Sequence, residues 1–134
     1  MAETMQFDLV SPERRLAALP ASDVRIPGAA GDLSAMPGHE PVITNLRPGL
    51  LRAVTAEGVK SYVVTGGFAE ISETGVIVLA ERAIPVDEVS GTVLDEILAQ
   101  ARKLADAATG EERDRAEKSV AEVTALRDAV LARH

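Results

Sequence analysis

The sequence predicts two structural classes in succession, a β-sandwich or barrel followed by a helical hairpin. All seven prolines and eight of the ten glycines lie at or before Pro85, whereas the rest of the chain is rich in alanine. The first part contains short alternating apolar runs with turn residues about every ten positions, which is typical of sandwiches and barrels. The second part has apolar residues at helical spacing. We therefore expect two domains, residues 1–86 and 87–134.

Strands are expected in the first domain wherever apolar and polar residues alternate between turn residues. The runs are Gln6–Val10, Val24–Ile26, Leu50–Thr55, Val59–Val64, Phe68–Ile71 and Val76–Leu79. Glu57-Gly58 and Glu73-Thr74-Gly75 predict hairpin turns between neighbouring runs. Gly66-Gly67 predicts a β-bulge. No long helical pattern separates the strands, so βαβ units are not expected.

Two helices are expected in the second domain. Thr92 with Asp95 fits a capping box at the start of the first helix, and Thr109 with Glu112 fits another at the start of the second. A short break between two apolar stripes predicts an antiparallel hairpin. Because both stripes are rich in alanine, they bury little apolar area, and the hairpin is expected to be held loosely.

Composition excludes several classes of function. The chain of 134 residues has 14 basic and 21 acidic residues and a net charge of −7, which disfavours binding to nucleic acid or anionic lipid. It has no cysteine, so disulfides and thiol catalysis are excluded. No apolar run approaches the ~20 residues of a membrane-spanning helix. The first residues, Met1–Thr4, resemble neither a secretory signal nor a transit peptide.

Residues that carry chemistry are scarce. The sequence has no P-loop and no dinucleotide-binding glycine motif. His39 and His134 are far apart and do not have the spacing of a metal pair. Ser34, His39 and Asp32 lie near one another in the sequence, which is no indication of triad geometry. A binding or structural role is therefore favoured over an enzyme, with no metal and no cofactor.

The segment Ile26–Gly49 is the most distinctive part of the chain. It contains four prolines and four glycines, which fix several tight turns. A turn cluster that closes a sandwich would explain these residues in general, but it would not require the sequence Pro37-Gly38-His39-Glu40-Pro41. Leu33 and Met36 lie in the same segment, where an exposed apolar side chain needs a partner.

This segment resembles the epsilon subunit of bacterial F-type ATP synthases. That family carries a G-x-x-G-[DE]-[LF]-x-x-x-P-G-H-x-P-x-x-T-x-L-x-P-G motif, which is nearly complete here from Gly28 to Gly49. Thr65–Ile71 resembles the family's S/T-G-G-F-x-E-V, and Val76–Ala83 resembles its V-T-V-L-A-D-x-A strand. The resemblance spans the whole chain, although its helical part is the least specific.

The resemblance implies a flattened β-sandwich of about ten strands followed by a mobile helical hairpin. It implies a non-catalytic subunit of the central rotor stalk, which couples proton flow to ATP synthesis. The sandwich would bind the gamma subunit and rest on the c ring. The protein would sit peripherally at the cytoplasmic face of the bacterial inner membrane, without inserting into it.

The same resemblance assigns residues to partners. Contact with the c ring falls to Asp32, Leu33 and Met36. Contact with the gamma subunit falls to Pro37, Gly38, His39 and Thr44. In an inhibitory state the helices would face the catalytic alpha and beta subunits, and the candidate contacts to beta are Arg102, Lys103, Arg113, Arg115, Lys118 and Arg127.

Some family members bind ATP through an I/L-D-x-x-R-A signature and an arginine on the second helix. Here Asp95 is kept, Leu98 stands at the arginine position, and Arg115 matches the second-helix arginine. Because leucine cannot replace a bidentate phosphate donor, nucleotide binding is expected to be weak or absent.

Two other classes of function remain open. A free-standing β-sandwich that binds a ligand or protein would need a binding platform, and three aromatic residues in the chain do not provide an aromatic one. A small hydrolase would need a cleft with converging carboxylates and would show turnover in isolation.

Overall fold

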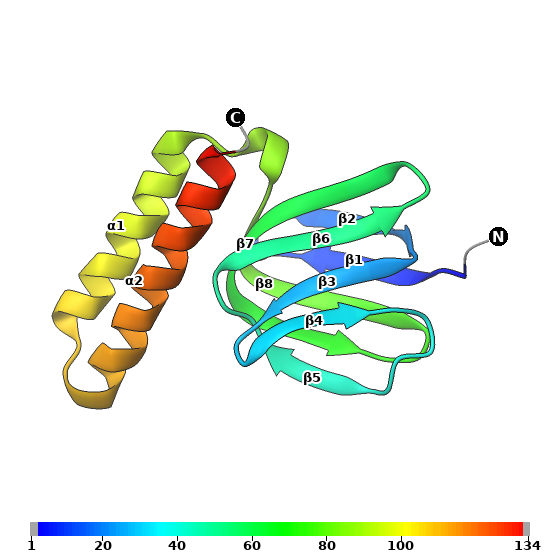
Figure 1. The fold of residues 1–134 in the computed structure, drawn as a ribbon, viewed down its shortest axis with the longest axis horizontal. Coiled ribbons are helices and arrows are strands. Elements are labelled where there is room, and N and C mark those ends of the chain that lie inside the picture. Colours follow the sequence, from blue (N-terminus) through cyan, green and yellow to red (C-terminus); the bar gives the residue numbers. More distant parts are fainter. Residues whose placement is uncertain (1–2, 133–134) are drawn as a thin grey trace. The chain divides into compact units, whose positions relative to one another are not determined.

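The computed structural model of the chain describes residues 3–132 and divides into two compact units, residues 1–86 and 87–134. The first unit contains eight strands (Figure 1). They are β1 (Met5–Val10), β2 (Arg15–Ala21), β3 (Asp23–Gly28), β4 (Gly31–Ala35), β5 (Val42–Asn45), β6 (Gly49–Thr55), β7 (Gly58–Ile71) and β8 (Gly75–Pro85).

The strands form one continuous sheet that curls on itself. The order is β2-β1-β8-β7-β6-β3-β4, and β5 pairs with β7. All pairings are antiparallel except that of β1 with β8, which is parallel. The edge strand β2 contacts β6 across the fold. The sheet thus closes around a core as a flattened sandwich, which confirms the predicted fold class.

Buried and exposed residues alternate along the strands, so that one side of each strand faces the core. Phe7 and Leu9 of β1, Leu51 of β6, and Val76 and Val78 of β8 are fully or almost fully buried. They belong to a cluster of 19 buried residues that lies entirely within the first unit. The sandwich therefore has a hydrophobic core of its own.

The strand prediction was wrong in several places. The runs Val59–Val64 and Phe68–Ile71 belong to the single strand β7, and β2, β4 and β5 were not predicted. β2 contains Pro20, which breaks the strand pattern in the sequence but is tolerated because β2 lies at the edge of the sheet. The strand count is eight rather than about ten.

The bulge predicted at Gly66-Gly67 is also wrong. Thr65 pairs with Arg82 and Gly67 pairs with Ala80, so the register of β7 on β8 is unchanged across the glycines. Both glycines have positive φ, and a Cβ at Gly67 would overlap the main chain of β8. The two glycines lie where the neighbour of β7 changes from β6 to β5.

The second unit is a helical hairpin (Figure 1). It consists of α1 (Gly91–Ala107) and α2 (Gly110–Leu131), and a 3-10 turn at Val86–Glu88 precedes it. Ile97, Leu98 and Val123 are its buried cluster, and smaller side chains flank them. The predicted hairpin is thus present. The predicted caps differ, because Ser90 rather than Thr92 caps α1, and the N-cap Thr109 makes no side-chain hydrogen bond.

Candidate functional site

The Pro- and Gly-rich segment forms one edge of the sandwich, and main-chain hydrogen bonds hold it together. Ala29 N donates to Asn45 O at 2.8 Å, and Arg47 N donates to Pro27 O at 3.0 Å. These bonds join the β3–β4 turn to the end of β5, although the two lie far apart in the sequence. The segment therefore presents its side chains from a fixed backbone.

Asp32 is exposed on β4 but is not free. Its carboxylate forms an ion pair with Arg47, with 2.5 Å between Oδ1 and Nη2, and Arg47 Nη1 donates to Gly28 O at 2.6 Å. The side chain of Asp32 is 54% exposed. Met36 is also exposed, whereas Leu33 packs partly against the core. Of the three residues assigned to the c ring, two thus face solvent, and Leu33 has a partner within the domain.

Pro37 and Gly38 occupy the central positions of a tight turn. His39 N donates to Met36 O at 3.1 Å, and Gly38 has a φ of +84°. Proline followed by a glycine with positive φ is the arrangement of a type II turn. Gly38 N also donates to Glu73 O at 2.9 Å. The Pro-Gly turn is therefore fastened to the β7–β8 turn.

His39 and Thr44 both have local hydrogen bonds. The half-buried His39 donates from Nδ1 to Glu40 O at 2.6 Å, so Nδ1 carries the proton. Thr44 Oγ1 donates to Asn45 O at 3.2 Å from within β5. Both side chains are partly accessible, but His39 follows the Pro-Gly turn, whereas Thr44 Oγ1 lies close to Gly28 at the β3–β4 turn. Asp32 pairs with Arg47 instead, so Ser34, His39 and Asp32 form no triad.

An exposed apolar face, which the sequence analysis missed, lies on β5, β7 and β8. Its members, which we call the apolar face, are Ile43, Phe68, Ile77 and Leu79, and their exposed fractions are 69%, 41%, 46% and 40%. The register joins them, because Phe68 pairs with Leu79, while Glu70 pairs with both Ile43 and Ile77.

The run Val76-Ile77-Val78-Leu79 contained the information needed to predict this face. A half-exposed antiparallel strand alternates apolar and polar residues, whereas this run is apolar on both sides. Such a run indicates that both faces of the strand are covered. Contiguous exposed apolar side chains mark interaction sites in soluble proteins.

The six cationic residues of the hairpin are placed differently from one another. Arg102, Lys103, Arg113, Arg115 and Lys118 are exposed. Arg113 Nε donates to Glu117 Oε1 at 2.9 Å, and this hydrogen bond and the charge of Glu117 raise the pKa of Arg113.

Arg127 is half-buried and joins the two helices. Its Nε lies 3.0 Å from Asp95 Oδ1, and their side chains are 36% and 60% exposed. The Nε atom is buried and makes no hydrogen bond of good geometry, so the contact is chiefly one of charge. Asp95 in the first helix is thus paired within the hairpin.

The two residues expected at a nucleotide site do not come together. Arg115 lies twelve residues before Arg127 on α2, about 18 Å along the helix axis. Asp95 lies beside Arg127. Leu98, at the position where the resembling family has arginine, is buried against Val123 in the centre of the hairpin. Among the described residues, neither Leu98 nor Arg115 therefore supplies a phosphate donor beside Asp95.

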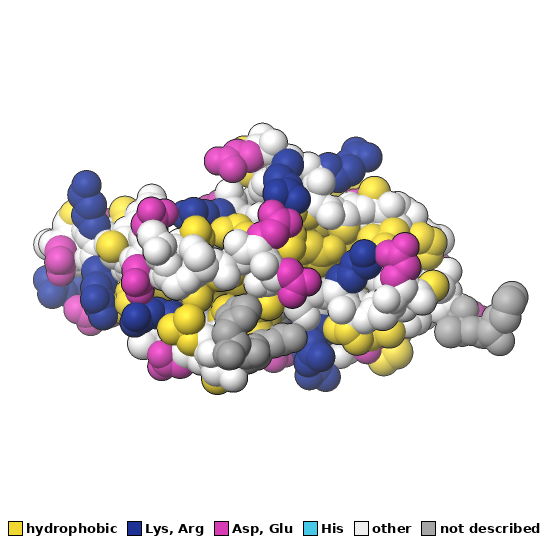
Figure 2. Space-filling model, turned by 90° about the horizontal axis from the view of Figure 1, so that it is seen from above, with side chains coloured by type: hydrophobic (Ala, Val, Ile, Leu, Met, Phe, Trp, Pro, Cys, Tyr) yellow, Lys and Arg dark blue, Asp and Glu magenta, His cyan; other side chains and the backbone are white. Residues whose placement is uncertain are grey.

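Charged side chains of both signs are mixed on the surface that Figure 2 shows, and residues 3–132 hold no metal-ligand cluster. Lys and Arg side chains alternate with Asp and Glu side chains on the face shown in Figure 2. Among residues 3–132, no three histidines or carboxylates group as a metal site would require, and His134 lies outside the described residues. Neither α1 nor α2 is long and apolar enough to cross a membrane.

Comparisons with known proteins agree with one another. A family model described as "ATP synthase, Delta/Epsilon chain, beta-sandwich domain" matches residues 4–86. An ATP synthase epsilon chain of Fuscovulum blasticum is 60% identical over 129 residues, covering 96% of this chain and 98% of the relative. One of Rhodobacter capsulatus is 58% identical over 126 residues, covering 94% and 96%.

The fold also has a counterpart among solved structures. A chain in the cryo-EM structure of the Euglena gracilis mitochondrial ATP synthase matches with a TM-score of 0.72 and 24% identity. The match covers 96% of this chain and 81% of that chain. At this level of identity the likeness concerns the fold.

Proposed function

The chain belongs to the family of ATP synthase epsilon chains, non-catalytic subunits of that complex, and on this basis we propose that its sandwich links the gamma subunit to the c ring. The observation that carries the proposal is the apolar face on β5, β7 and β8. Four large apolar side chains exposed around Glu70 are costly in water unless a partner covers them.

The gamma subunit is the proposed partner of the apolar face. Ile43 pairs with Glu70 of β7, and the Pro-Gly turn, which His39 follows, is bonded to the β7–β8 turn at the end of the same strands. Glu70 and His39 therefore supply polar groups near the apolar centre, whereas Thr44 alternates with Ile43 and lies on the other side of β5. An apolar centre with a polar rim is the usual anatomy of a protein interface.

The c ring is the proposed partner of the edge around Asp32. The Asp32 carboxylate is held by Arg47 but remains half exposed, so it can still attract a cation from a polar loop. Met36 adds an exposed apolar side chain close by in the sequence. Binding at this edge would place the subunit peripherally at the cytoplasmic face of the bacterial inner membrane.

The hairpin is the proposed regulatory element. Its buried cluster is small, and its exposed cations are available to the acidic surfaces of catalytic subunits. Opening the hairpin would break the Asp95–Arg127 pair and free Arg127 to join the other cations. An element with two arrangements of similar free energy can act as a switch.

The test uses a catalytic complex stripped of its epsilon subunit. The full chain and a variant ending at Asp87 are added separately, and binding and ATP hydrolysis are measured. We expect both to bind and only the full chain to inhibit hydrolysis. Binding without inhibition would retain the link to the complex and remove the regulatory role. If neither bound, a free-standing sandwich module would be the better description.

Nucleotide binding has its own test. Because Leu98 is buried and Arg115 lies far from Asp95, millimolar ATP should cause no change in the NMR spectrum of the full chain. A micromolar dissociation constant would show that the hairpin rearranges to build a site.

A further inference from the structure

Two arginines face one another on the outer surface of the sandwich. Arg25 of β3 and Arg52 of β6 are direct cross-strand partners, and both are exposed. Like charges at such positions destabilise a sheet. Within residues 3–132, neither guanidinium has a carboxylate within ion-pairing distance. The pair is thus unfavourable in the isolated chain.

Hydrogen-bond donors extend the pair into a row. Ser34 pairs with Arg25, Arg25 with Arg52, and Arg52 with Ser61, so one row crosses β4, β3, β6 and β7. A guanidinium has five donors and no acceptor, in a geometry that fits a carboxylate. The row therefore favours an anionic group.

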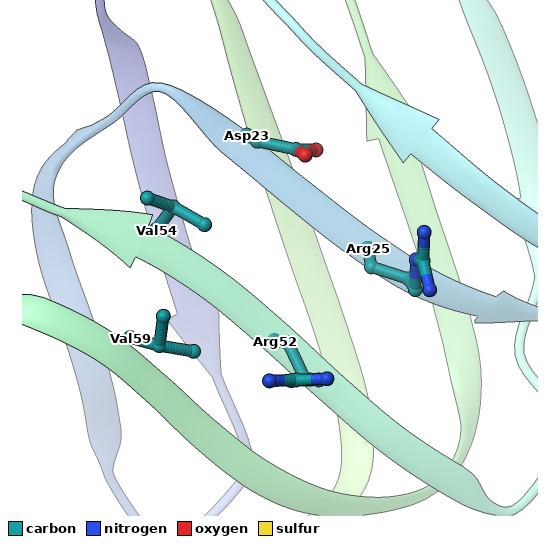
Figure 3. Close-up of a pocket in the computed structure, with 5 residues that line it drawn as sticks. All are labelled: Asp23, Arg25, Arg52, Val54 and Val59. Atoms are coloured by element: carbon teal, nitrogen blue, oxygen red, sulfur yellow. The ribbon is translucent and has the colours of Figure 1, made fainter.

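The next row supplies an acceptor and apolar surface. A pocket of about 220 Å³ lies between β3, β6 and β7 (Figure 3). Its lining consists of the two arginines together with Asp23, Val54 and Val59. Asp23 Oδ1 is buried there without a hydrogen-bond partner. Val54 and Val59 are cross-strand partners with exposed fractions of 39% and 54%.

We propose that this pocket, which we call the arginine pocket, binds an acidic segment of a partner protein. A carboxylate of the segment bridges Arg25 and Arg52, an N–H or O–H group donates to Asp23, and an apolar side chain covers the valines. The two guanidinium groups, the Asp23 carboxylate and the exposed valines would then each have a partner.

A peptide segment fits better than a nucleotide or a free phosphate. The pocket is smaller than the roughly 300–1,000 Å³ of sites for drug-sized ligands. A phosphate would satisfy the arginines, but it would bring negative charge towards Asp23 and leave the valines exposed. Because the chain carries a net charge of −7, an acidic partner depends on a local cationic site to approach it.

The identity of the partner rests on the proposed function, which makes it another subunit of the ATP synthase. The arginine pocket lies on the same side of the sheet as Asp32, because Asp32 and Ser34 alternate with a residue between them on β4. An acidic segment in the pocket would therefore extend the proposed contact edge across the sheet.

The experiment compares two charge reversals in the full chain. Arg52→Glu changes the pocket, and Arg15→Glu is the control at an exposed position on β2 with the same change in net charge. Binding of each variant to the epsilon-depleted complex is measured. We expect Arg52→Glu to weaken binding at least 10-fold, Arg52→Lys to weaken it less, and Arg15→Glu to change it less than 2-fold.

Thermal unfolding of the free chain separates binding from folding. Since Arg52→Glu replaces a repulsive pair with an attractive one, its unfolding midpoint should be equal to or higher than that of the parent. Weaker binding with unchanged or raised stability supports the arginine pocket. Equal losses in Arg52→Glu and Arg15→Glu, or no loss in either, would overturn it while the proposed function stands. Failure of the parent chain to bind would overturn both.

Discussion

Replacing Ile43 with threonine should weaken binding to the gamma subunit while leaving the fold intact. Threonine keeps the branched Cβ that suits a strand, so the change removes apolar contact and adds a hydroxyl. Ile43 is 69% exposed in the free chain. Most of the apolar area of the Ile43 side chain therefore stays in contact with water until a partner covers it.

The magnitude follows from this exposure. The change removes two apolar carbons, and burial of each carbon would contribute about 0.8 kcal/mol to binding. Multiplying this contribution by the fraction of Ile43 that is exposed in the free chain gives a loss of about 1 kcal/mol. Desolvation of the new hydroxyl adds about 1 kcal/mol. The sum of about 2 kcal/mol corresponds to a dissociation constant raised about 30-fold. Ile77→Thr should have a smaller effect, because Ile77 is only 46% exposed.

The assay is titration calorimetry of the full chain with the gamma subunit, together with thermal unfolding of each variant. Leu104→Gln is the control, because Leu104 is 63% exposed on α1 and lies outside the apolar face. The reasoning is refuted if Ile43→Thr binds as tightly as the parent, or if Leu104→Gln loses as much affinity.

Three further predictions concern the fold itself. Gly67→Ala should lower the free energy of unfolding by about 2–4 kcal/mol in a urea titration, because a Cβ would overlap the β8 main chain at a φ of +102°; a change below about 0.5 kcal/mol would mean that β7 can straighten there. Asp95→Asn should speed amide hydrogen exchange in both helices by about 2–5-fold, since it removes the charge facing Arg127; unchanged exchange would show that the pair adds nothing. Lys60→Ala should raise the pKa of Glu57 towards its ordinary value, because the Lys60 hydrogen bond and then its charge lower it. The Glu57–Lys60 pair stabilises the folded state at pH values above the pKa of Glu57 in the unfolded chain, and this contribution is lost as the pH falls through the lower pKa of the folded state. NMR titration of the Glu57 carboxyl group in the parent and the variant measures the two pKa values. Equal values would contradict the prediction.

Local rules predicted the elements whose determinants lie close together in the sequence. The hairpins predicted at Glu57-Gly58 and Glu73–Gly75 are present, although the first turns through Ala56-Glu57 and Gly58 already pairs with Thr55. α1 and α2 follow the apolar stripes. The rules failed where pairing over long distances decides the outcome. β2 is a strand because β1 pairs with it and the sheet tolerates a proline at its edge.

The candidate site was predictable in part. The motif from Gly28 to Gly49 indicated the correct family, because tight turns restrict which residues fit. The sequence could not show that Asp32 pairs with Arg47 or that Asp95 pairs with Arg127, since both contacts need the tertiary fold. The arginine pair was equally hidden, because Arg25 and Arg52 meet only through the register of β3 on β6.

The parallel pairing of β1 with β8 has a consequence for synthesis on the ribosome. Gln6 pairs with Gly75, so β1, the first strand to be synthesised, cannot pair with β8 until the last strand of the sandwich has been synthesised. The β6–β7–β8 meander joins neighbouring segments and can form early, whereas closure of the sheet pays a large loop entropy. Until residues 75–79 have emerged, β1 and β2 can pair only with each other, and a two-stranded ribbon is marginally stable at best. A pause in translation before β8 has emerged would prolong the life of that species.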